Sequence, residues 1–216
     1  YPVEVPRTCD EFDSPGLGLQ WQWEANYESD WVSLDARKGW LRLYSQLPSP
    51  KYKNLWNVPS LMLQKMPAPA FSATARFEPA QQSVGEKSGL VVFGLDYSYI
   101  GIGKSKAGYT ISHIVCTKAD KGTQEETTAS VDASGSEIYL RVEVRPESAS
   151  EMIPKVLCSF SYSVDGKTFR PLGKMFTARE GLWVGAKVGV FALGSAATEK
   201  SGYTDVDWFR IERLEN

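Results

Sequence analysis

Apolar and polar residues alternate with a period of two along most of this chain, and helical periodicity is almost absent. The clearest run is 137–144, where Ile138, Leu140, Val142 and Val144 share one face because strand side chains point alternately to opposite sides. Comparable runs occur at 31–34, 40–44, 71–77, 97–103, 109–115, 156–163, 186–192 and 204–211, and 90–95 is a continuous apolar run typical of a central strand. Short strands separated by turn residues predict an all-β fold, a sandwich or jelly roll of two packed antiparallel sheets.

Two long connections between the runs stand out by composition. Segment 45–59 contains three prolines with Tyr52 and Trp56 between them. Proline stiffens a loop, so its aromatic rings either line a binding surface or cap the edge of the core. Segment 119–136 is polar and is predicted to be a loop.

The composition favours one domain and excludes several classes of partner. The 216 residues are 42% hydrophobic and include seven Trp, ten Tyr and nine Phe, enough for one large β core without a compositional break. A net charge of −2 gives no electrostatic basis for binding nucleic acid or an anionic membrane. No apolar run approaches the roughly 20 residues that span a bilayer. Because the sequence lacks an initiator Met and a signal peptide, we expect a processed chain or a fragment of a longer protein.

Residues for nucleophilic or zinc-dependent catalysis are scarce. The single histidine, His113, lies in an alternating run, so a hydrogen-bonded strand histidine is favoured over a catalytic base. The cysteines Cys9, Cys116 and Cys158 form no Cys-x-x-Cys pair, and the last two lie in apolar runs typical of buried thiols. The sequence leaves open whether two of these cysteines form a disulfide. It also leaves open whether two carboxylates form the catalytic pair of a glycosidase, because their separation cannot be derived from sequence.

Acidic residues gather near both ends of the chain. Asp10, Glu11 and Asp13 precede the first predicted strand, and Asp205 and Asp207 lie in the last. If the first and last strands of the sandwich pair, these oxygens approach one another and form a site that suits Ca²⁺. We therefore predict a structural calcium site from Asp10, Glu11, Asp13 and Asp207, although the spacing is not that of an EF-hand. The alternative is that these carboxylates are solvated or cap backbone groups.

Aromatic residues are the candidates for binding sugars, because sugar rings present C–H faces that stack on Trp and Tyr while carboxylates accept hydrogen bonds from hydroxyls. Asp96, Tyr97 and Tyr99 follow the central run 90–95, where a concave sheet face would expose them. Trp56 and Trp183 lie outside the regular alternation. We predict these five residues as the carbohydrate-binding set.

The remaining tryptophans are predicted to be core residues. In segment 10–23, Leu19, Trp21 and Trp23 would share one face of a first strand. Trp208 alternates with its neighbours in the same way within the last run. Their regular spacing favours burial over contact with a ligand.

Several motifs in order make the chain similar to a known family. The N-terminal motif is Glu11-Phe12-Asp13-Ser14-Pro15 followed by 17–23, and the later matching segments are 88–94, 96–100, 161–167, 185–191 and 202–209. From about Asp10 to Ile211, this pattern resembles the C-terminal concanavalin A-like domain of family 43 glycoside hydrolases, the β-xylosidases and related arabinofuranosidases. Each motif alone is modest, and their shared order is specific.

The resemblance implies a concanavalin A-like β-sandwich over 10–216, with 1–9 as the remnant of a linker from a five-bladed propeller that holds the catalytic carboxylates. In such β-xylosidases the sandwich leans against the catalytic pocket, and one loop inserts an aromatic residue that helps to close it. The corresponding loop is expected at 78–87, which contains Gln81, Gln82 and Val84 but no aromatic residue. The resemblance also implies an extracellular or periplasmic location.

Three functions follow as hypotheses. The first is a non-catalytic ancillary domain that binds or positions xylan or arabinoxylan beside a catalytic propeller, since related domains are described as xylan-binding modules. The second is a purely structural domain that stabilises the propeller and has no ligand site. The third is a stand-alone glycosidase. The implied partners are the propeller domain and a xylan-type carbohydrate, with no nucleic acid and no membrane.

Overall fold

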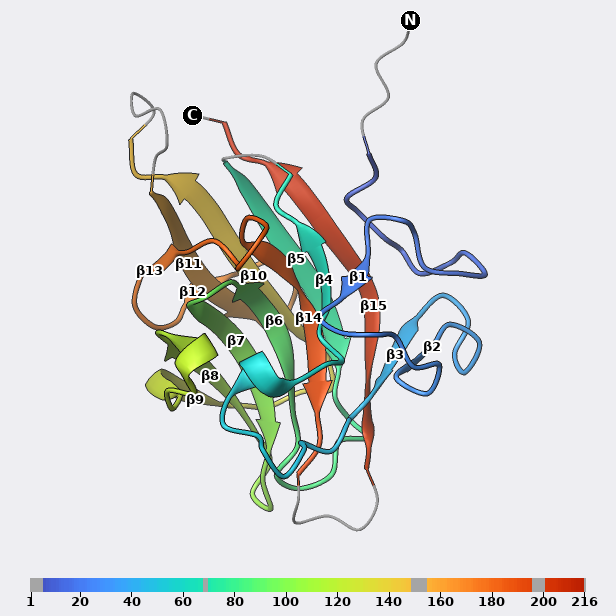
Figure 1. The fold of residues 1–216 in the computed structure, drawn as a ribbon. Coiled ribbons are helices and arrows are strands. Elements are labelled where there is room, and N and C mark those ends of the chain that lie inside the picture. Colours follow the sequence, from blue (N-terminus) through green and yellow to red (C-terminus); the bar gives the residue numbers. More distant parts are fainter. Residues whose placement is uncertain (1–5, 68–69, 149–154, 196–200, 216) are drawn as a thin grey trace, which may run out of the picture.

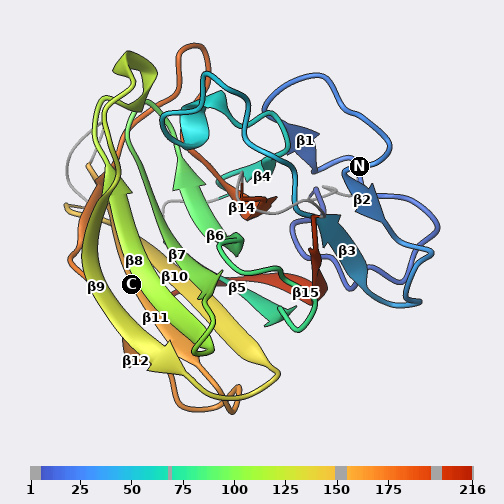
Figure 2. The same cartoon turned by 90° about the horizontal axis from the view of Figure 1, so that it is seen from below.

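The computed structural model describes residues 6–67, 70–148, 155–195 and 201–215, which form two antiparallel sheets packed face to face (Figure 1). One sheet has the strand order β1-β4-β14-β6-β7-β8-β9, and the other has the order β12-β11-β10-β5-β15-β3-β2, with β13 paired to β11. Figure 2 shows the sheets as two curved layers, with β6, β7 and β8 in one and β5, β10 and β15 in the other. The predicted all-β sandwich is confirmed. Among the described residues, no helix has the length and apolar character needed to cross a membrane.

The strand bounds follow the predicted runs closely. The first sheet contains β1 (Gln22–Trp23), β4 (Met62–Lys65), β14 (Lys187–Leu193), β6 (Lys87–Phe93), β7 (Tyr97–Lys104), β8 (Tyr109–Cys116) and β9 (Glu126–Ala133). The second contains β12 (Arg170–Pro171), β11 (Val156–Ser163), β10 (Ile138–Pro146), β5 (Phe71–Glu78), β15 (Tyr203–Arg213), β3 (Leu41–Tyr44), β2 (Val32–Ser33) and β13 (Phe176–Ala178). Two short 3₁₀ helices, η1 (Leu55–Asn57) and η2 (Ala119–Lys121), lie in the connections.

The main core lies between the sheets and is built from alternate residues of both. Leu90 and Val92 of β6 face Leu140 and Val142 of β10 across this layer, and all four are fully buried. Each such side chain contributes about 1.5–3 kcal/mol through burial. The alternation of 137–144 therefore identified the buried face of β10 correctly.

A second apolar layer covers the outer face of the seven-stranded sheet. Val91 and Phe93 alternate with the main-core residues of β6 and therefore point away from that core, into a cluster with Leu55 of η1. Figure 1 shows η1 lying in front of this sheet. Tyr52 and Trp56 pack against the same cluster, so the rings of segment 45–59 cap apolar surface, as the second interpretation of that segment held.

Four strands were missed by the prediction, namely β4, β9 and the very short strands β12 and β13. Segment 119–136 was predicted to be a loop, but it contains the edge strand β9, which is mostly polar and only partly buried. Edge strands commonly carry polar residues, which discourage pairing with other chains, and this removes the apolar alternation. Strand β4 has only four residues, too few to establish a period.

The N-terminal segment forms a turn and a very short strand instead of the predicted continuous one. Leu19 is wholly exposed, because the chain turns back when the Trp21 backbone N–H donates to Gly18 O at 3.2 Å. The prediction that Leu19 shares a buried face was wrong. Trp21 is buried and Trp23 is half-buried against the core, in agreement with their predicted role.

Trp208 was predicted to be a core residue and is not. The register between β15 and β5 shifts between Val206 and Phe209, both fully buried. Such a bulge inserts a residue and reverses the facing of those near it. Trp208 is consequently half-buried beside Tyr139, with the Arg210 guanidinium 4.2 Å from its ring centroid.

Candidate functional site

Two of the predicted sugar-binding tyrosines lie inside the outer apolar layer. Tyr97 is 0% exposed and Tyr99 is 2% exposed. The Tyr97 hydroxyl donates to Glu125 Oε1 at 2.7 Å and accepts from the Leu55 backbone N–H at 2.9 Å, while Lys87 Nζ lies 2.8 Å from both Tyr99 Oη and Glu125 Oε2. Burial, reinforced by the Glu125 charge, raises the pKa of Tyr97 far above its usual value. The expected exposure of these rings on a concave face is not met.

Trp56 and Asp96 are each engaged within the domain. The Trp56 ring stacks on Phe93 with centroids 5.8 Å apart and 19° between the planes, and it is half-buried. Asp96 Oδ1 accepts hydrogen bonds from the Lys118 backbone N–H at 2.7 Å and from Arg179 Nη1 at 3.3 Å. Both retain some accessible surface, and their binding of sugar stays a prediction.

Trp183 lies at the tip of a loop that is held by the neighbouring hairpin. The Gly181 backbone N–H donates to Val184 O at 2.8 Å and closes the tip. The Leu95 N–H donates to Glu180 O at 2.9 Å and attaches the loop to the turn between β6 and β7. A tight turn with an anchored stem holds the indole away from the rest of the protein. Trp183 is 95% exposed.

The surface around Trp183 is apolar and open to solvent. Leu182 is 61% exposed and Val184 is 44% exposed, whereas Met175, which is 64% exposed, lies in a different loop. Consecutive exposed apolar residues at a loop tip are unfavourable in water and commonly mark a site that contacts a ligand or another protein. Arg179, four residues before Trp183, is charged, and its Nη1 donates to Asp96 Oδ1.

Two of the predicted calcium ligands are paired with arginines. Glu11 accepts two hydrogen bonds from Arg210, each 2.8 Å long, and Asp207 Oδ2 lies 2.5 Å from Arg76 Nη1. The Arg210 hydrogen bonds are the main reason that the pKa of Glu11 is lowered. A cation bound here would have to compete with both guanidinium groups.

The first and last segments do pair, as the calcium hypothesis required. Asp10 and Phe209 form an antiparallel bridge, and Asp10 Oδ2 accepts from Trp21 Nε1 at 2.8 Å. Asp13 is exposed. Within the ranges that the structure describes, no group of three or more His, Cys, Asp or Glu side chains is arranged to hold a metal ion. Calcium stays a prediction; a melting temperature that chelator lowers would support it, and an unchanged one would contradict it.

The single histidine and the cysteines have structural environments. His113 is fully buried, with Nε2 2.9 Å from Ser98 Oγ, as predicted for a hydrogen-bonded strand histidine. All three cysteines are free thiols. Cys116 and Cys158 are buried as predicted, and burial raises the pKa of Cys158 to about 12. Neither is suited to nucleophilic attack at neutral pH.

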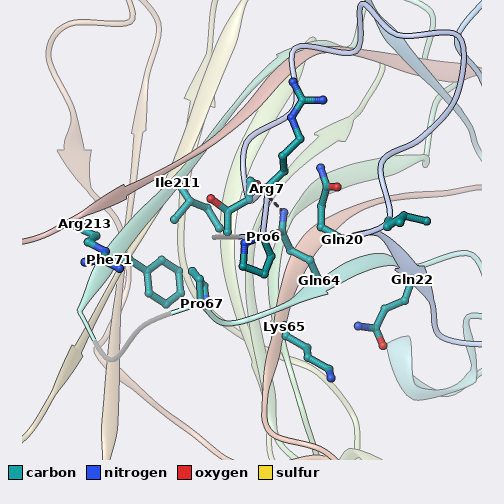
Figure 3. A pocket seen from close by; sticks show the side chains of 12 residues that line it. Pro6, Arg7, Gln20, Gln22, Gln64, Lys65, Pro67, Phe71, Ile211 and Arg213 are labelled. Carbon is teal, nitrogen blue, oxygen red and sulfur yellow. Dashed lines mark hydrogen bonds between the residues drawn. The ribbon is translucent and has the colours of Figure 1, made fainter. Parts of the chain in front are cut away.

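Sequence reasoning missed a groove of about 530 Å³ between residues 6–8, which belong to the predicted linker, and the end of the first sheet (Figure 3). Its polar lining consists of three glutamines and three basic residues: Gln20, Gln22, Gln64, Arg7, Lys65 and Arg213. They come from the linker, the turn before β1, and strands β1, β4 and β15. Residues this far apart in the sequence form no motif, so only the fold brings them together.

Comparisons with known proteins agree on one family and fold. The family model described as the beta xylosidase C-terminal concanavalin A-like domain matches residues 9–212. A beta-xylosidase of Formosa agariphila is 29% identical over 230 residues, covering 98% of this chain and 36% of that protein. Two solved structures share the fold. A bifunctional GH43-CE protein of Bacteroides eggerthii has a TM-score of 0.82 at 21% identity, covering 96% of this chain and 26% of its own. A xylan β-1,4-xylosidase of Bacillus halodurans C-125 has a TM-score of 0.78 at 20% identity, and the match covers 99% of this chain and 40% of that one. The chain thus spans about a third of the curated relative.

Proposed function

The chain belongs to the family of C-terminal concanavalin A-like domains of family 43 β-xylosidases, and we propose that it is a non-catalytic ancillary domain that contacts xylan-type carbohydrate beside a catalytic propeller. The contact is made by the loop tip that carries Trp183. The main support is the 95% exposure of this indole at the tip of a turn that backbone hydrogen bonds hold in place. Of the seven tryptophans, all of which are described, the other six are buried or half-buried.

An exposed tryptophan suits a sugar for a physical reason. The indole face is apolar and flat, so it can stack on the apolar C–H face of a pyranose ring. Arg179 at the stem of this loop and Asp96 in the turn between β6 and β7 lie 3.3 Å apart and would supply a donor and an acceptor for hydroxyls. Few polar groups beside an aromatic platform are typical of ligand sites.

Loop 78–87, which the family resemblance matches to the pocket-closing loop, carries no aromatic residue, and two of its side chains are held within this domain. Gln82 is buried and its Nε2 donates to Ser88 Oγ at 2.9 Å. Glu86 is also buried and accepts from Ser45 Oγ at 3.0 Å and from the Gly202 N–H at 2.7 Å.

Affinity electrophoresis of the isolated chain in gels containing xylan, arabinan or β-glucan tests the proposal. We expect xylan to retard the chain, and Trp183→Ala to remove the retardation while leaving the melting temperature unchanged, because the side chain is exposed. Met175→Ala, which removes another exposed apolar side chain, is the matched control and should migrate like the parent chain. Absence of retardation by all three polysaccharides would contradict direct binding.

The second candidate is a structural domain that stabilises the propeller. The apolar character of residues 182–184 favours it as well, because such a tip also suits burial against protein. It predicts that Trp183→Ala lowers the melting temperature of the full-length protein and leaves polysaccharide binding unchanged. Hydrolysis of an aryl xyloside by the pure isolated chain would instead support the third hypothesis, a stand-alone glycosidase.

A further inference from the structure

We propose that the groove between the linker and strand β4 binds a hexuronic acid residue of an acidic oligosaccharide. The groove is separate from the Trp183 loop and uses none of its residues. Its volume of about 530 Å³ lies within the range of small-molecule sites, which is about 300–1,000 Å³. The inference rests on the proposed function only in taking the ligand to be a carbohydrate.

The charge of the groove is the first argument. Arg7, Lys65 and Arg213 line it, and among the described residues that line it there is no Asp or Glu. Each of these three basic side chains is exposed, and none forms an ion pair with the acidic groups that the structure describes, although the chain as a whole carries a net charge of −2. Basic side chains around one concave site attract an anion, and a carboxylate accepts charge-assisted hydrogen bonds from them.

The amides are the second argument, because they select a hydroxylated ligand over a simple ion. Gln64 is only 2% exposed, and its Nε2 donates to Thr8 O at 3.0 Å, which fixes the amide in the floor of the groove. Gln20 and Gln22 lie on one side in Figure 3, and Phe71 lies on the other. An amide both donates and accepts, which matches a sugar hydroxyl.

The apolar lining is consistent with a ring-shaped ligand. Pro6 and Pro67 border the groove and are exposed, and Leu19 projects from the turn before β1 with its whole side chain in solvent. These side chains offer apolar contact to the C–H faces of a pyranose. A hexuronic acid combines the three required features, namely a carboxylate, hydroxyls and an apolar ring face.

Isothermal titration of the chain with three oligosaccharides tests the inference. The probes are a xylotriose substituted with glucuronic acid, a galacturonic acid trimer and neutral xylotetraose. We expect at least one acidic probe to bind about tenfold more tightly than xylotetraose, and added salt to reduce that difference. The two acidic arms distinguish a xylan source of the carboxylate from a pectin source.

Lys65→Gln/Arg213→Gln is the test variant, and Lys51→Gln/Arg170→Gln is the control with the same loss of charge at exposed positions outside the groove. The test variant should lose about tenfold in affinity for the acidic probe, while the control and Trp183→Ala bind normally. Unchanged binding by the test variant, or equal binding of neutral xylotetraose, would overturn the inference. Failure of both acidic oligosaccharides to bind would overturn it too. If, in that case, the double substitution lowered the melting temperature of the full-length protein, an acidic protein segment would be indicated as the occupant of the groove.

Discussion

At the scale of single residues, His113 makes the stability of the domain depend on pH. Its ring is fully buried, with Nδ1 2.5 Å from Thr128 Oγ1, and burial lowers its pKa from 6.5 to about 4. Between these two values the unfolded chain binds a proton that the folded chain does not. Stability is therefore complete above pH 6.5 and declines as the pH falls through this window, by up to about 3 kcal/mol.

Urea unfolding at pH 7 and pH 4.5 measures this effect. We expect the parent chain to lose stability between the two values, and His113→Gln to lose less, because glutamine does not titrate. The comparison uses the pH difference within each protein, so an overall weakening of the variant does not affect it. Equal losses in both proteins would contradict the role of His113.

Asp205 of β15 forms a largely buried ion pair with Arg42 of the neighbouring strand β3. Its carboxylate is 2.8 Å from Arg42 Nε and 3.0 Å from Arg42 Nη2, and the Asp205 side chain is 7% exposed. We predict that Asp205→Ala lowers the free energy of unfolding by about 3 kcal/mol, since it leaves a partly buried guanidinium unpaired. Asp35→Ala, which breaks an exposed ion pair with Lys38, should leave the free energy of unfolding measured by chemical denaturation unchanged.

Residue exposure was the least predictable property of the candidate site. Tyr97 follows a central strand in the sequence and could have faced solvent, but segment 45–59 covers it. Trp183 could have belonged to the strand that follows, but the turn closed by Gly181 keeps it outside. Sequence alternation shows that neighbours face opposite ways, and it does not show which distant segment covers a face.

At the scale of elements, the close packing of β4 against β14 depends on a residue without a side chain. A Cβ on Gly189 would lie 2.0 Å from Met62 O and 2.7 Å from Leu63 Cα. Both contacts are with the backbone of the neighbouring strand, which cannot move aside without disturbing the ladder. We predict that Gly189→Ala lowers stability by about 3 kcal/mol in a denaturant titration.

Gly103→Ala in strand β7 is the matched control for this prediction. Its nearest contact would be Thr110 O at 3.9 Å, an ordinary van der Waals distance. The control should keep or slightly raise the stability of the parent chain, because alanine restricts the unfolded state. Similar effects of the two substitutions would show that the spacing between β4 and β14 is not the cause.

Strands with one buried face were predictable, and strands without one were not. The run 137–144 gave both the existence and the facing of β10 because its alternation is strict. β9 is polar and lies at an edge, so no apolar period marks it. In β15 the bulge between Val206 and Phe209 changes the facing midway, and the alternation that led to the placement of Trp208 does not report such a change.

At the scale of the whole molecule, the domain presents two candidate contacts with carbohydrate that differ in chemistry. The Trp183 tip is apolar, and the groove beside the linker is basic and rich in amides. The motifs shared with the family predicted the sandwich and its membership, since they span nearly the whole chain. They did not predict either contact: Trp183 was proposed as a sugar-binding residue because it lies outside the regular alternation, and the groove depends on residues that are distant in sequence.

The most direct test of the central proposal compares kcat/KM on xylo-oligosaccharides between the unsubstituted full-length protein and its Trp183→Ala variant. The Met175→Ala variant is the control. If the Trp183 tip contacts the carbohydrate beside the catalytic domain, Trp183→Ala lowers kcat/KM about tenfold, which corresponds to a loss of about 1.4 kcal/mol of transition-state stabilisation. The Met175→Ala protein and both melting temperatures stay at parental values. An unchanged kcat/KM in Trp183→Ala would contradict the proposal.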